Sequence, residues 1–443
     1  MSPRVHHPSR TVALLFLGLI ALGTLLLRLP VSAASGEASP WLVALFTATS
    51  AVCVTGLAVV DTGTHWSFFG QAVILALVQL GGFGLMTAAA LLGLMVNRTM
   101  RLRTRLTTQA ETHAIGLGDV QSIARVVLAV TVVCELALAA WLATWLHTRH
   151  DMPGREALWS GIFHSISAFN NAGFGLHGDS LMRYASDAGV LVPIMLGIVL
   201  GGIGFPVFQD IRARMQEGGH WSLHTKITLL GSGVLLLGGM LALLAFEWSN
   251  PKTLGPMGWG DKLLSAAFTS VSARTAGFNS VDIAALTQES LALHYLLMFI
   301  GGGSAGTAGG VKVSTAMILV LLVLAEVRGR PDSEAFGRRI CPTAQRQAIT
   351  VLVLSSAAVV LGSMILLRVT DFPTDQIIFE VISAFGTVGL STGITAQLPP
   401  TGQLVLVVLM YIGRVGTLTL ATSLALGERR RAIRYPEEHP IVG

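Results

Sequence analysis

The sequence predicts an all-α membrane protein with four tandem helix–pore loop–helix repeats, in which eight transmembrane helices surround a central pore with pseudo-fourfold symmetry. Three observations carry this prediction. The 443 residues are 52% hydrophobic and 12% charged, whereas soluble domains have about 25% charged residues. Eight apolar segments are long enough to cross a hydrocarbon core of about 30 Å. One short motif recurs four times between those segments.

The predicted spans follow from runs of about 20 mostly apolar residues. They fall at 11–29, 70–96, 126–147, 189–209, 227–246, 291–325, 348–367 and 403–426. The first span follows Arg4 and Arg10 and could be read as a signal sequence. We interpret it as a retained helix, because the apolar run from Thr11 to Leu27 is too long for an ordinary signal-peptide core.

Basic residues predict the orientation of the spans. With a cytoplasmic N-terminus, 19 Lys and Arg residues lie on the cytoplasmic side, 8 lie on the outer side, and Lys312 and Arg414 remain within apolar sequence. This asymmetry places both termini in the cytoplasm. It also accounts for the pI of about 9.4 without nucleic acid as a partner. Membrane lipid is instead the expected surrounding.

The outer segments contain the recurring motif. They read FTATSAVCVTGLAVVD, FHSISAFNNAGFGLHGD, FTSVSARTAGFNSVD and FEVISAFGTVGLSTGIT. Aligning their serines (Ser50, Ser167, Ser272 and Ser383) places a glycine five or six residues later in each: Gly56, Gly173, Gly277 and Gly389, here called the four aligned glycines. A second glycine cluster follows 24 to 28 residues further on. A unit of about 110 residues is therefore repeated four times.

The repeat divides the chain into segments. They are a cytoplasmic N-terminus (1–10), repeat 1 (11–98), repeat 2 (121–215), repeat 3 (223–330, with a glycine-rich intramembrane loop at 301–310), repeat 4 (344–428) and a cytoplasmic tail (429–443).

A short apolar helix precedes each aligned glycine. About 12 residues span only about 18 Å, so the helix must enter the membrane and return. Backbone at that depth must be enclosed by protein or line a water-filled cavity. Four such turns around one axis would form a pore. In the alternative interpretation, the four segments are amphipathic loops at the membrane surface and their glycines provide flexibility.

The turns have the chemistry of a cation filter. A dehydrated monovalent cation needs several oxygen ligands, which backbone carbonyls supply without buried negative charges. Successive carbonyls can face one axis only if the backbone alternates between negative and positive φ, and glycine adopts positive φ without strain. The helix C-terminal ends would also favour a cation. The candidate K⁺-coordinating residues are Cys53, Val54, Thr55 and Gly56; Asn170, Asn171, Ala172 and Gly173; Arg274, Thr275, Ala276 and Gly277; and Gly386, Thr387, Val388 and Gly389.

Charged residues near the turns have more than one interpretation. Asp61, Asp179 and Asp282 follow the aligned glycines of the first three units; they either cap or solvate loops, or form a negative vestibule that concentrates cations. We expect Arg274 to pair with an acid behind its turn. Glu135 is expected to be an inward-facing structural partner without a transport role.

Two basic residues remain within the membrane, where each needs a partner or water. Arg414, in IGRVG, is either an electrostatic barrier in the pore or an arginine neutralised by carbonyls of the neighbouring unit. Lys312 closes the stretch GGGSAGTAGGVKVST, whose glycines cannot hold a helix. This stretch is either a flexible gating loop or a kink used for packing. The candidate gating residues are Gly301, Gly302, Gly303, Gly306, Gly309, Gly310, Lys312 and Arg414.

No constellation supports an enzyme. Glycines of the 301–310 loop superficially match nucleotide-binding fingerprints, but no soluble strand precedes them and Val311 and Val313 interrupt the required adjacency. The three cysteines lack metal-ligand spacing. An alternating-access secondary transporter of another small cation or solute remains an alternative, although repeats that run in the same direction favour a pore.

These motifs resemble the membrane subunit of the Trk/Ktr/HKT superfamily of potassium transporters, close to the KtrB type. The resemblance rests on VCVTG, NNAGF, TAGFN and GTVGL, on the glycine-rich loop and on the arginine of IGRVG, and it covers the chain from Arg10 onward. It implies K⁺ coordination at the turns that end in the four aligned glycines. Gly56, where some plant relatives have serine, favours K⁺ over Na⁺.

The resemblance also implies an assembly. It predicts a gate at Gly301–Gly310 with Arg414 beneath the filter, in a homodimer of the bacterial cytoplasmic membrane. A cytosolic ring of KtrA- or TrkA-like regulatory subunits would bind ATP or ADP, and no cofactor is expected in this chain itself. The basic segments 98–105 and 328–346 would be docking surfaces for that ring.

Overall fold

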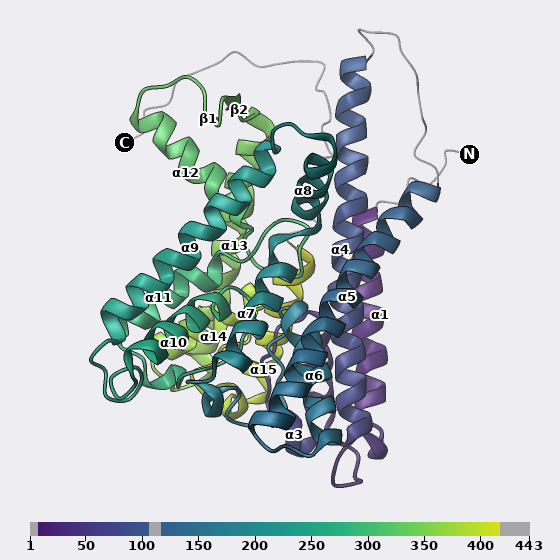
Figure 1. Cartoon of the computed structure of the whole chain (residues 1–443), viewed down its shortest axis with the longest axis vertical. Helices are drawn as coiled ribbons and strands as arrows, with labels where there is room; N and C mark the ends of the chain where they lie inside the picture. Colours follow the sequence, from purple (N-terminus) through teal and green to yellow (C-terminus); the bar gives the residue numbers. More distant parts are fainter. Residues whose placement is uncertain (1–7, 106–116, 417–443) are drawn as a thin grey trace.

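The computed structural model describes residues 8–105 and 117–416, almost all of them in helices and their connections. Most long helices run along the long axis of the molecule (Figure 1). The first helices are α1 (Pro8–Leu27), α2 (Trp41–Val52), α3 (Thr62–His65), α4 (Phe68–Arg105), α5 (Leu117–Arg149), α6 (Gly154–Phe169), α7 (Ala188–Ile203) and α8 (Phe205–Glu217). They are followed by α9 (Leu223–Glu247), α10 (Trp259–Ser272), α11 (Gln288–Phe299), α12 (Val313–Val327), α13 (Pro342–Val369), α14 (Thr374–Gly386) and α15 (Pro400–Tyr411).

Short elements connect these helices. Four 3₁₀ turns are η1 (Pro30–Ser32), η2 (Met182–Tyr184), η3 (Ile283–Ala285) and η4 (Thr395–Gln397), and a π-helical turn, η5 (Ile412–Gly416), extends α15. Strands β1 (Glu334–Ala335) and β2 (Arg338–Arg339) form a small antiparallel hairpin at the end of the molecule opposite α3 (Figure 1).

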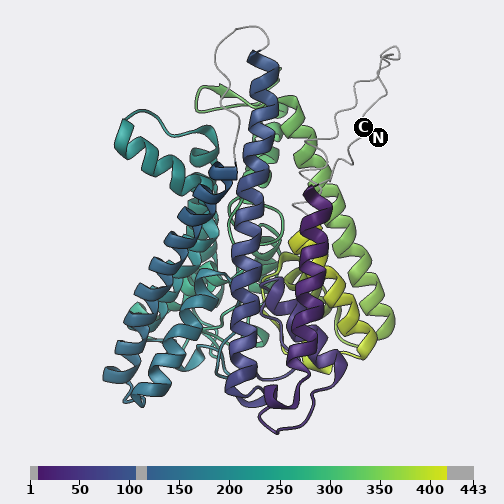
Figure 2. The same ribbon diagram turned by 90° about the vertical axis from the view of Figure 1, so that its right-hand side faces the viewer.

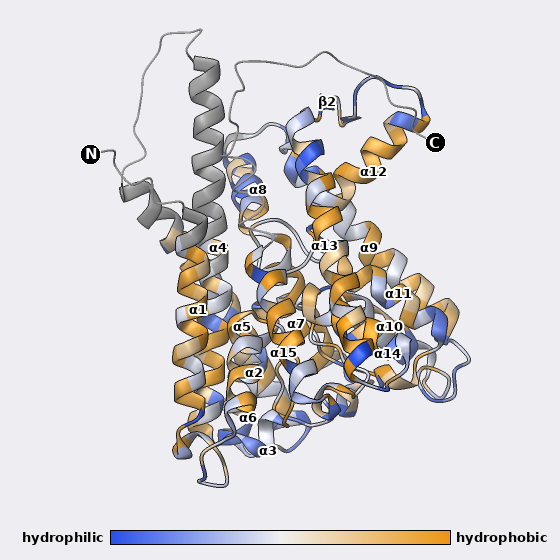
Figure 3. Ribbon diagram, turned by 180° about the vertical axis from the view of Figure 1, so that it is seen from behind, coloured by the Kyte–Doolittle hydropathy of each residue, from blue (hydrophilic) through white to orange (hydrophobic). Residues whose placement is uncertain are grey.

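Three helices within the described residues are long and apolar enough to cross a membrane. They are α9, α13 and the part of α5 from Ala124 to Arg149. Thr11–Leu27, Phe68–Gly84, Val313–Val327 and Pro400–Gly416 are shorter apolar helices. Large apolar side chains on the outer surfaces of the long helices are exposed, as at Leu136, Leu237 and Val353. Figure 3 shows this apolar band between more hydrophilic ends, which is the pattern of a protein that faces lipid.

Two predicted spans are broken. The segment predicted at 189–209 ends as α7 at Ile203 and restarts as α8 after a bend of 89°. Gly204 makes this bend possible with a φ of 99°, and a Cβ there would collide with the carbonyl of Ser304. The segment predicted at 291–325 divides into α11 and α12 around the glycine-rich loop, as the glycine content predicts.

The ends of the chain meet. Figure 2 shows α1, in purple, beside the yellow-green C-terminal helices. Tyr411 of α15 donates its hydroxyl hydrogen to the carbonyl of Ala13 in α1 at 2.9 Å. One buried cluster combines side chains of α1, α2 and α4 with those of α14 and α15, including Phe46, Val381 and Met410. The last unit therefore packs against the first and closes a ring.

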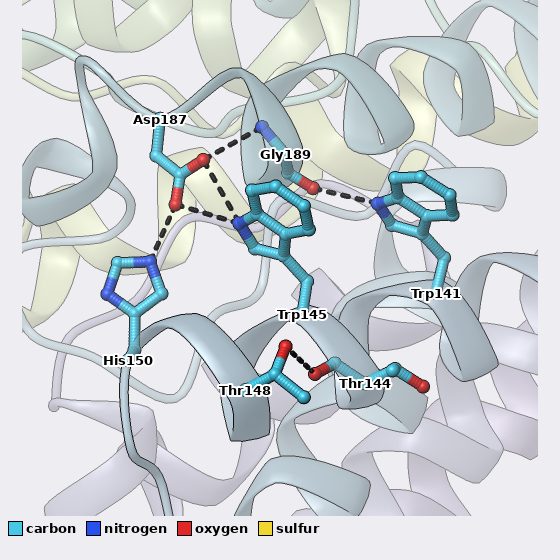
Figure 4. A network of polar contacts seen from close by, with 7 residues as sticks. All are labelled: Trp141, Thr144, Trp145, Thr148, His150, Asp187 and Gly189. Atoms are coloured by element: carbon cyan, nitrogen blue, oxygen red, sulfur yellow. Dashed lines mark hydrogen bonds and ion pairs between the residues drawn. The ribbon is translucent and has the colours of Figure 1, made fainter.

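A polar network at the α3 end of the molecule joins α5 to α7 (Figure 4). Asp187 accepts hydrogen bonds from the backbone N–H of Gly189 at 2.8 Å and from the indole of Trp145 at 3.0 Å, and it contacts His150 Nε2 at 2.6 Å. The indole of Trp141 donates to the carbonyl of Gly189 at 3.0 Å. Asp187 thus caps α7 while it fixes the neighbouring helix.

Candidate functional site

Four short helices carry the aligned turns. They are α2, α6, α10 and α14, and their C-terminal ends lie at Val52, Phe169, Ser272 and Gly386, immediately before or within the predicted filter residues. All four have buried C-terminal halves. Each turn therefore lies inside the protein, where the partial negative charge at the end of a helix is poorly screened.

In each of the four turns, residues with left-handed backbone conformation (positive φ) alternate with residues of negative φ. Each aligned glycine has a positive φ: 90° at Gly56, 68° at Gly173, 78° at Gly277 and 95° at Gly389. The residue two positions earlier is also left-handed in every unit: Val54, Asn171, Thr275 and Thr387. Left-handed φ values are strained for β-branched residues. Because this strain recurs at Val54, Thr275 and Thr387, and Asn171 adopts the same conformation, the surrounding structure imposes it.

The four aligned glycines form a closed ring. A Cβ at Gly56 would lie 2.5 Å from the carbonyl oxygen of Ala172, and one at Gly173 would lie 2.8 Å from that of Ala276. In the same way, a Cβ at Gly277 would approach the carbonyl oxygen of Val388, and a Cβ at Gly389 would approach that of Thr55 in the first unit. Each glycine thus faces the carbonyl that precedes the glycine of the next unit, so main-chain oxygens gather around one narrow axis.

The aligned serines hold the turns from behind. In the first and fourth units, the N–H groups of Gly56 and Gly389 donate to Ser50 and Ser383 Oγ at 3.1 and 3.2 Å. In the second and third units, Ser167 and Ser272 donate instead to carbonyls one residue beyond the glycine. The sequence pattern aligned these serines between the units but did not indicate their hydrogen-bonding role. Their spacing of five or six residues from the glycines was the available signal.

A cavity of about 420 Å³ lies on the α3 side of the glycine ring, which is the lower end of the molecule in Figure 1. We call this side of the ring "above" and the opposite side "beneath". It is lined by the four aligned glycines and by the segments that follow them. Asp61 and Asp282 line it, but each also caps a short helix, with backbone N–H groups of Thr64 and Ala284 as donors. Both interpretations of these acids therefore have structural support.

Asp179 differs from the other two acids. It forms an ion pair with Arg183, with 2.7 Å between Arg183 Nη2 and Asp179 Oδ1. The hydrogen bonds from Arg183 hold the pKa of the Asp179 carboxyl below its usual value. Its charge is balanced locally, so it adds little to a negative vestibule.

The glycine-rich loop packs against the turns from the other side. A Cβ at Gly302 would lie 2.5 Å from the carbonyl of Gly202, and one at Gly309 would lie 3.0 Å from that of Gly386. The N–H of Gly303 donates to the carbonyl of Gly202 at 2.7 Å. These glycines therefore permit close packing against the end of α7 and the fourth turn. Flexibility is not the only reason for their presence.

Arg414 and Lys312 both donate to carbonyls of this loop. Arg414 is 1% exposed, and its Nη1 donates to the carbonyl of Thr307. Lys312 Nζ donates to the carbonyl of Ala308 and contacts that of Gly309 at 3.5 Å. Arg414 Nε and Nη2 have no partner among the described residues. The predicted carbonyl contact is present, but a carbonyl leaves the positive charge of Arg414 in place. Thr307 carried no sequence signal.

The expectation for Arg274 was wrong. Its Nη2 donates to the carbonyl of Gly301 at 2.8 Å and its Nη1 to that of Ser232 at 3.4 Å. No acid pairs with it within the described ranges, because α9 and the glycine-rich loop present carbonyls to it. Arg274 therefore connects the third turn to the start of the loop.

Glu135 has the structural role predicted for it. It is 6% exposed, and its Oε1 accepts a hydrogen bond from Asn170 Nδ2 at 3.0 Å. The same nitrogen donates to Gln79 Oε1 at 2.8 Å. Glu135 of α5 and Gln79 of α4 thus fix the first residue of the second turn.

Some predictions fall outside the described residues. They concern the N-terminal segment 1–7, the part of the last predicted span and of repeat 4 after residue 416, the tail 429–443, and the side chains of the basic segment 98–105.

The fold and site define a membrane protein that encloses a narrow, carbonyl-lined axis between a cavity and a buried loop. The sequence profile of TrkH, described as "Cation transport protein", matches residues 1–430. The chain belongs to this family of cation transport proteins, whose members are transporters and not enzymes.

Individual relatives agree with this assignment. Ktr system potassium uptake protein B of Bacillus subtilis is 40% identical, covering 98% of this chain and 97% of that protein. Potassium/sodium uptake protein NtpJ of Enterococcus hirae is 36% identical, with 98% and 97% covered. The crystal structure of the potassium transporter TrkH from Vibrio parahaemolyticus is similar in fold, with a TM-score of 0.71 and 19% identity over 95% of this chain and 85% of that one.

Proposed function

We propose that this chain mediates K⁺ uptake through a selectivity filter of backbone carbonyls at the four turns. The cyclic contact of each aligned glycine with a carbonyl of the next unit carries the proposal. A ring of main-chain oxygens can replace the water that a K⁺ ion loses, and the four helix ends directed at the ring favour a cation. The filter residues are those predicted from the sequence, from Cys53–Gly56 to Gly386–Gly389.

The loop at 301–310 is the gate in this proposal. It lies against the filter turns on the side opposite the cavity, and Arg414 and Lys312 bind its carbonyls. These contacts favour a closed pathway, because a buried cation beneath the filter raises the energy of a second cation nearby. Opening requires the loop to leave Arg414.

The membrane arrangement completes the proposal. Eight crossings in four repeats surround the filter with pseudo-fourfold symmetry, and both termini face the cytoplasm of a bacterium. The chain works as a homodimer with a cytosolic nucleotide-binding ring. The printed names of its relatives, which include a Ktr system potassium uptake protein and a potassium/sodium uptake protein, support K⁺ as cargo and make Na⁺ the ion to compare.

Growth of a K⁺-uptake-deficient bacterium at low K⁺ tests this function. We expect the chain to restore growth, and more strongly when a cytosolic regulatory partner is present. Flux of K⁺ into proteoliposomes of the purified chain, in competition with Na⁺, gives the ion preference. No rescue and no K⁺ flux from a folded, membrane-inserted protein would refute the proposal.

A further inference from the structure

Glu380 is a buried carboxylate that the proposed filter does not use. It lies on α14, the short helix of the fourth unit, and is 0% exposed. Its oxygens accept hydrogen bonds from Ser391 Oγ at 2.5 Å, from Thr392 N at 3.0 Å and from Thr395 Oγ1 at 2.8 Å. Complete burial disfavours the ionised form of this carboxylate, and the converging donors oppose that effect by stabilising the negative charge. No basic side chain within the described ranges forms an ion pair with it.

The segment that Glu380 holds is a wall of the cavity above the glycine ring. Ser391, Thr392 and Thr395 all line that cavity, as does Gly389. One turn further along α14, Ser383 accepts the N–H of Gly389. The same face of α14 therefore fixes both the fourth turn and the cavity wall beside it.

The position of Glu380 is specific to the fourth unit. Three residues before the aligned serine, the other units have Thr47, His164 and Thr269. The fourth unit is also the one without an aspartate five or six residues after its aligned glycine. Each unit thus has one carboxylate near the cavity, and in the fourth unit it lies behind the wall instead of on it.

We propose that Glu380 is a positioning residue that increases the affinity of the cavity and filter for a monovalent cation. It holds the wall from Ser391 to Thr395 and places an uncompensated negative charge behind it. A buried charge is screened less by salt than an exposed one, so Glu380 acts on a cation more strongly than the ion-paired Asp179. This inference rests on the proposed function, because it assumes that cations occupy this site.

Thermal stability of the purified full chain, titrated with K⁺ at constant ionic strength, measures cation binding directly. Glu380→Gln removes the charge and nearly preserves the shape. We expect the K⁺ concentration for half-maximal stabilisation to rise about fivefold, which is the order of effect of one partly screened charge. N-methylglucamine chloride replaces KCl to hold the ionic strength constant.

Glu247→Gln is the matched control. Glu247 is also buried, at 1% exposed, and accepts hydrogen bonds from Asn250, Thr253 and Thr287, but neither it nor these partners line the cavity. Its neutralisation should lower the melting temperature and leave the K⁺ midpoint unchanged. An unchanged midpoint in Glu380→Gln, or equal shifts in both variants, overturns the inference.

A second variant covers the case in which Glu380→Gln does not fold. Thr392→Val with Thr395→Val removes, at nearly constant volume, the two threonine hydroxyls that donate to Glu380 at 3.4 and 2.8 Å, so Glu380 is protonated more readily. The K⁺ midpoint should rise in this variant as well, and an unchanged midpoint contradicts the inference. K⁺ flux measured in parallel distinguishes the two proposals. Glu380-dependent binding without flux refutes only the proposed function, whereas wild-type flux with an unshifted midpoint refutes only the role of Glu380.

Discussion

Gly56 illustrates how a single residue is constrained twice. Its φ of 90° disfavours any side chain, and a Cβ would approach the carbonyl of Ala172 in the next unit. A hydroxymethyl group would displace that carbonyl from the ring. The residue is therefore required by the ring as well as by its own backbone.

Gly56→Ser should lower the preference for K⁺ over Na⁺ about tenfold, because displaced carbonyls no longer match the larger ion. Competitive flux in proteoliposomes measures the ratio. Gly36→Ser is the matched control, since Gly36 has a φ of 76° but no atom within 4 Å of its Cβ position. An unaltered ratio in Gly56→Ser would argue against coordination by this ring.

Arg414→Ala should increase K⁺ flux severalfold in the absence of regulatory stimulation. It removes the positive charge beneath the ring and releases the carbonyl of Thr307. Arg414→Lys preserves the charge and should remain close to the wild type. Lower flux in a correctly folded Arg414→Ala protein would contradict the role of a barrier.

At the scale of elements, the glycine-rich loop contacts three units. It contacts the end of α7 through Gly303, the third turn through Arg274, and η5 through the carbonyl that Arg414 binds. Movement of this loop would therefore disturb several turns together.

Deletion of residues 304–307 should produce a pathway that conducts K⁺ without stimulation, because the acceptor for Arg414 is lost. Basal flux from proteoliposomes is the measurement. Removal of residues 35–38 is the control, since these four residues are exposed, lie between η1 and α2, and belong to neither the ring nor the expected docking segments. Wild-type closure in the 304–307 deletion would exclude a gating role.

The cap of α7 makes a prediction about stability. Burial raises the pKa of the Asp187 carboxyl, but hydrogen bonds from His150, Trp145 and the N–H of Gly189 outweigh burial and lower the pKa overall. Asp187→Asn should therefore cost about 1 kcal/mol near neutral pH. A carboxyl whose pKa is lowered in the folded state stabilises the fold at pH values above its unfolded-state pKa of about 3.9. This stabilisation is lost as the pH falls through the folded-state pKa. Thermal unfolding of both proteins should converge at acidic pH, below the folded-state pKa of Asp187, and a constant difference would contradict this account.

At the scale of the whole molecule, the ring depends on the contact between the first and last units. Tyr411 of α15 binds Ala13 of α1, and Phe46 and Met410 share one core cluster. A chain that folds four similar units must bring its ends together, because an open arrangement would expose the turn backbone to lipid.

Much of this arrangement was predictable from local patterns. The recurrence of serine and glycine five or six residues apart located all four turns, and the glycine content of 301–310 predicted the break between α11 and α12. The bend at Gly204 was not predicted, because its cause is the approach of Ser304 from another unit. The partners of Arg274 were mispredicted because carbonyls leave no trace in a residue pattern.

Apolar run length, charge asymmetry and the fourfold motif are properties of neighbouring residues along the chain. They were sufficient for the all-helical membrane class and for the places of the four turns in the chain. Three other features depend on residues that are far apart in the sequence. They are the contact of each aligned glycine with a carbonyl of the next unit, the hydrogen bond from Arg414 to Thr307, and the position of Glu380 behind the cavity wall. Such contacts arise when packing brings whole units together, so they became visible in the folded molecule.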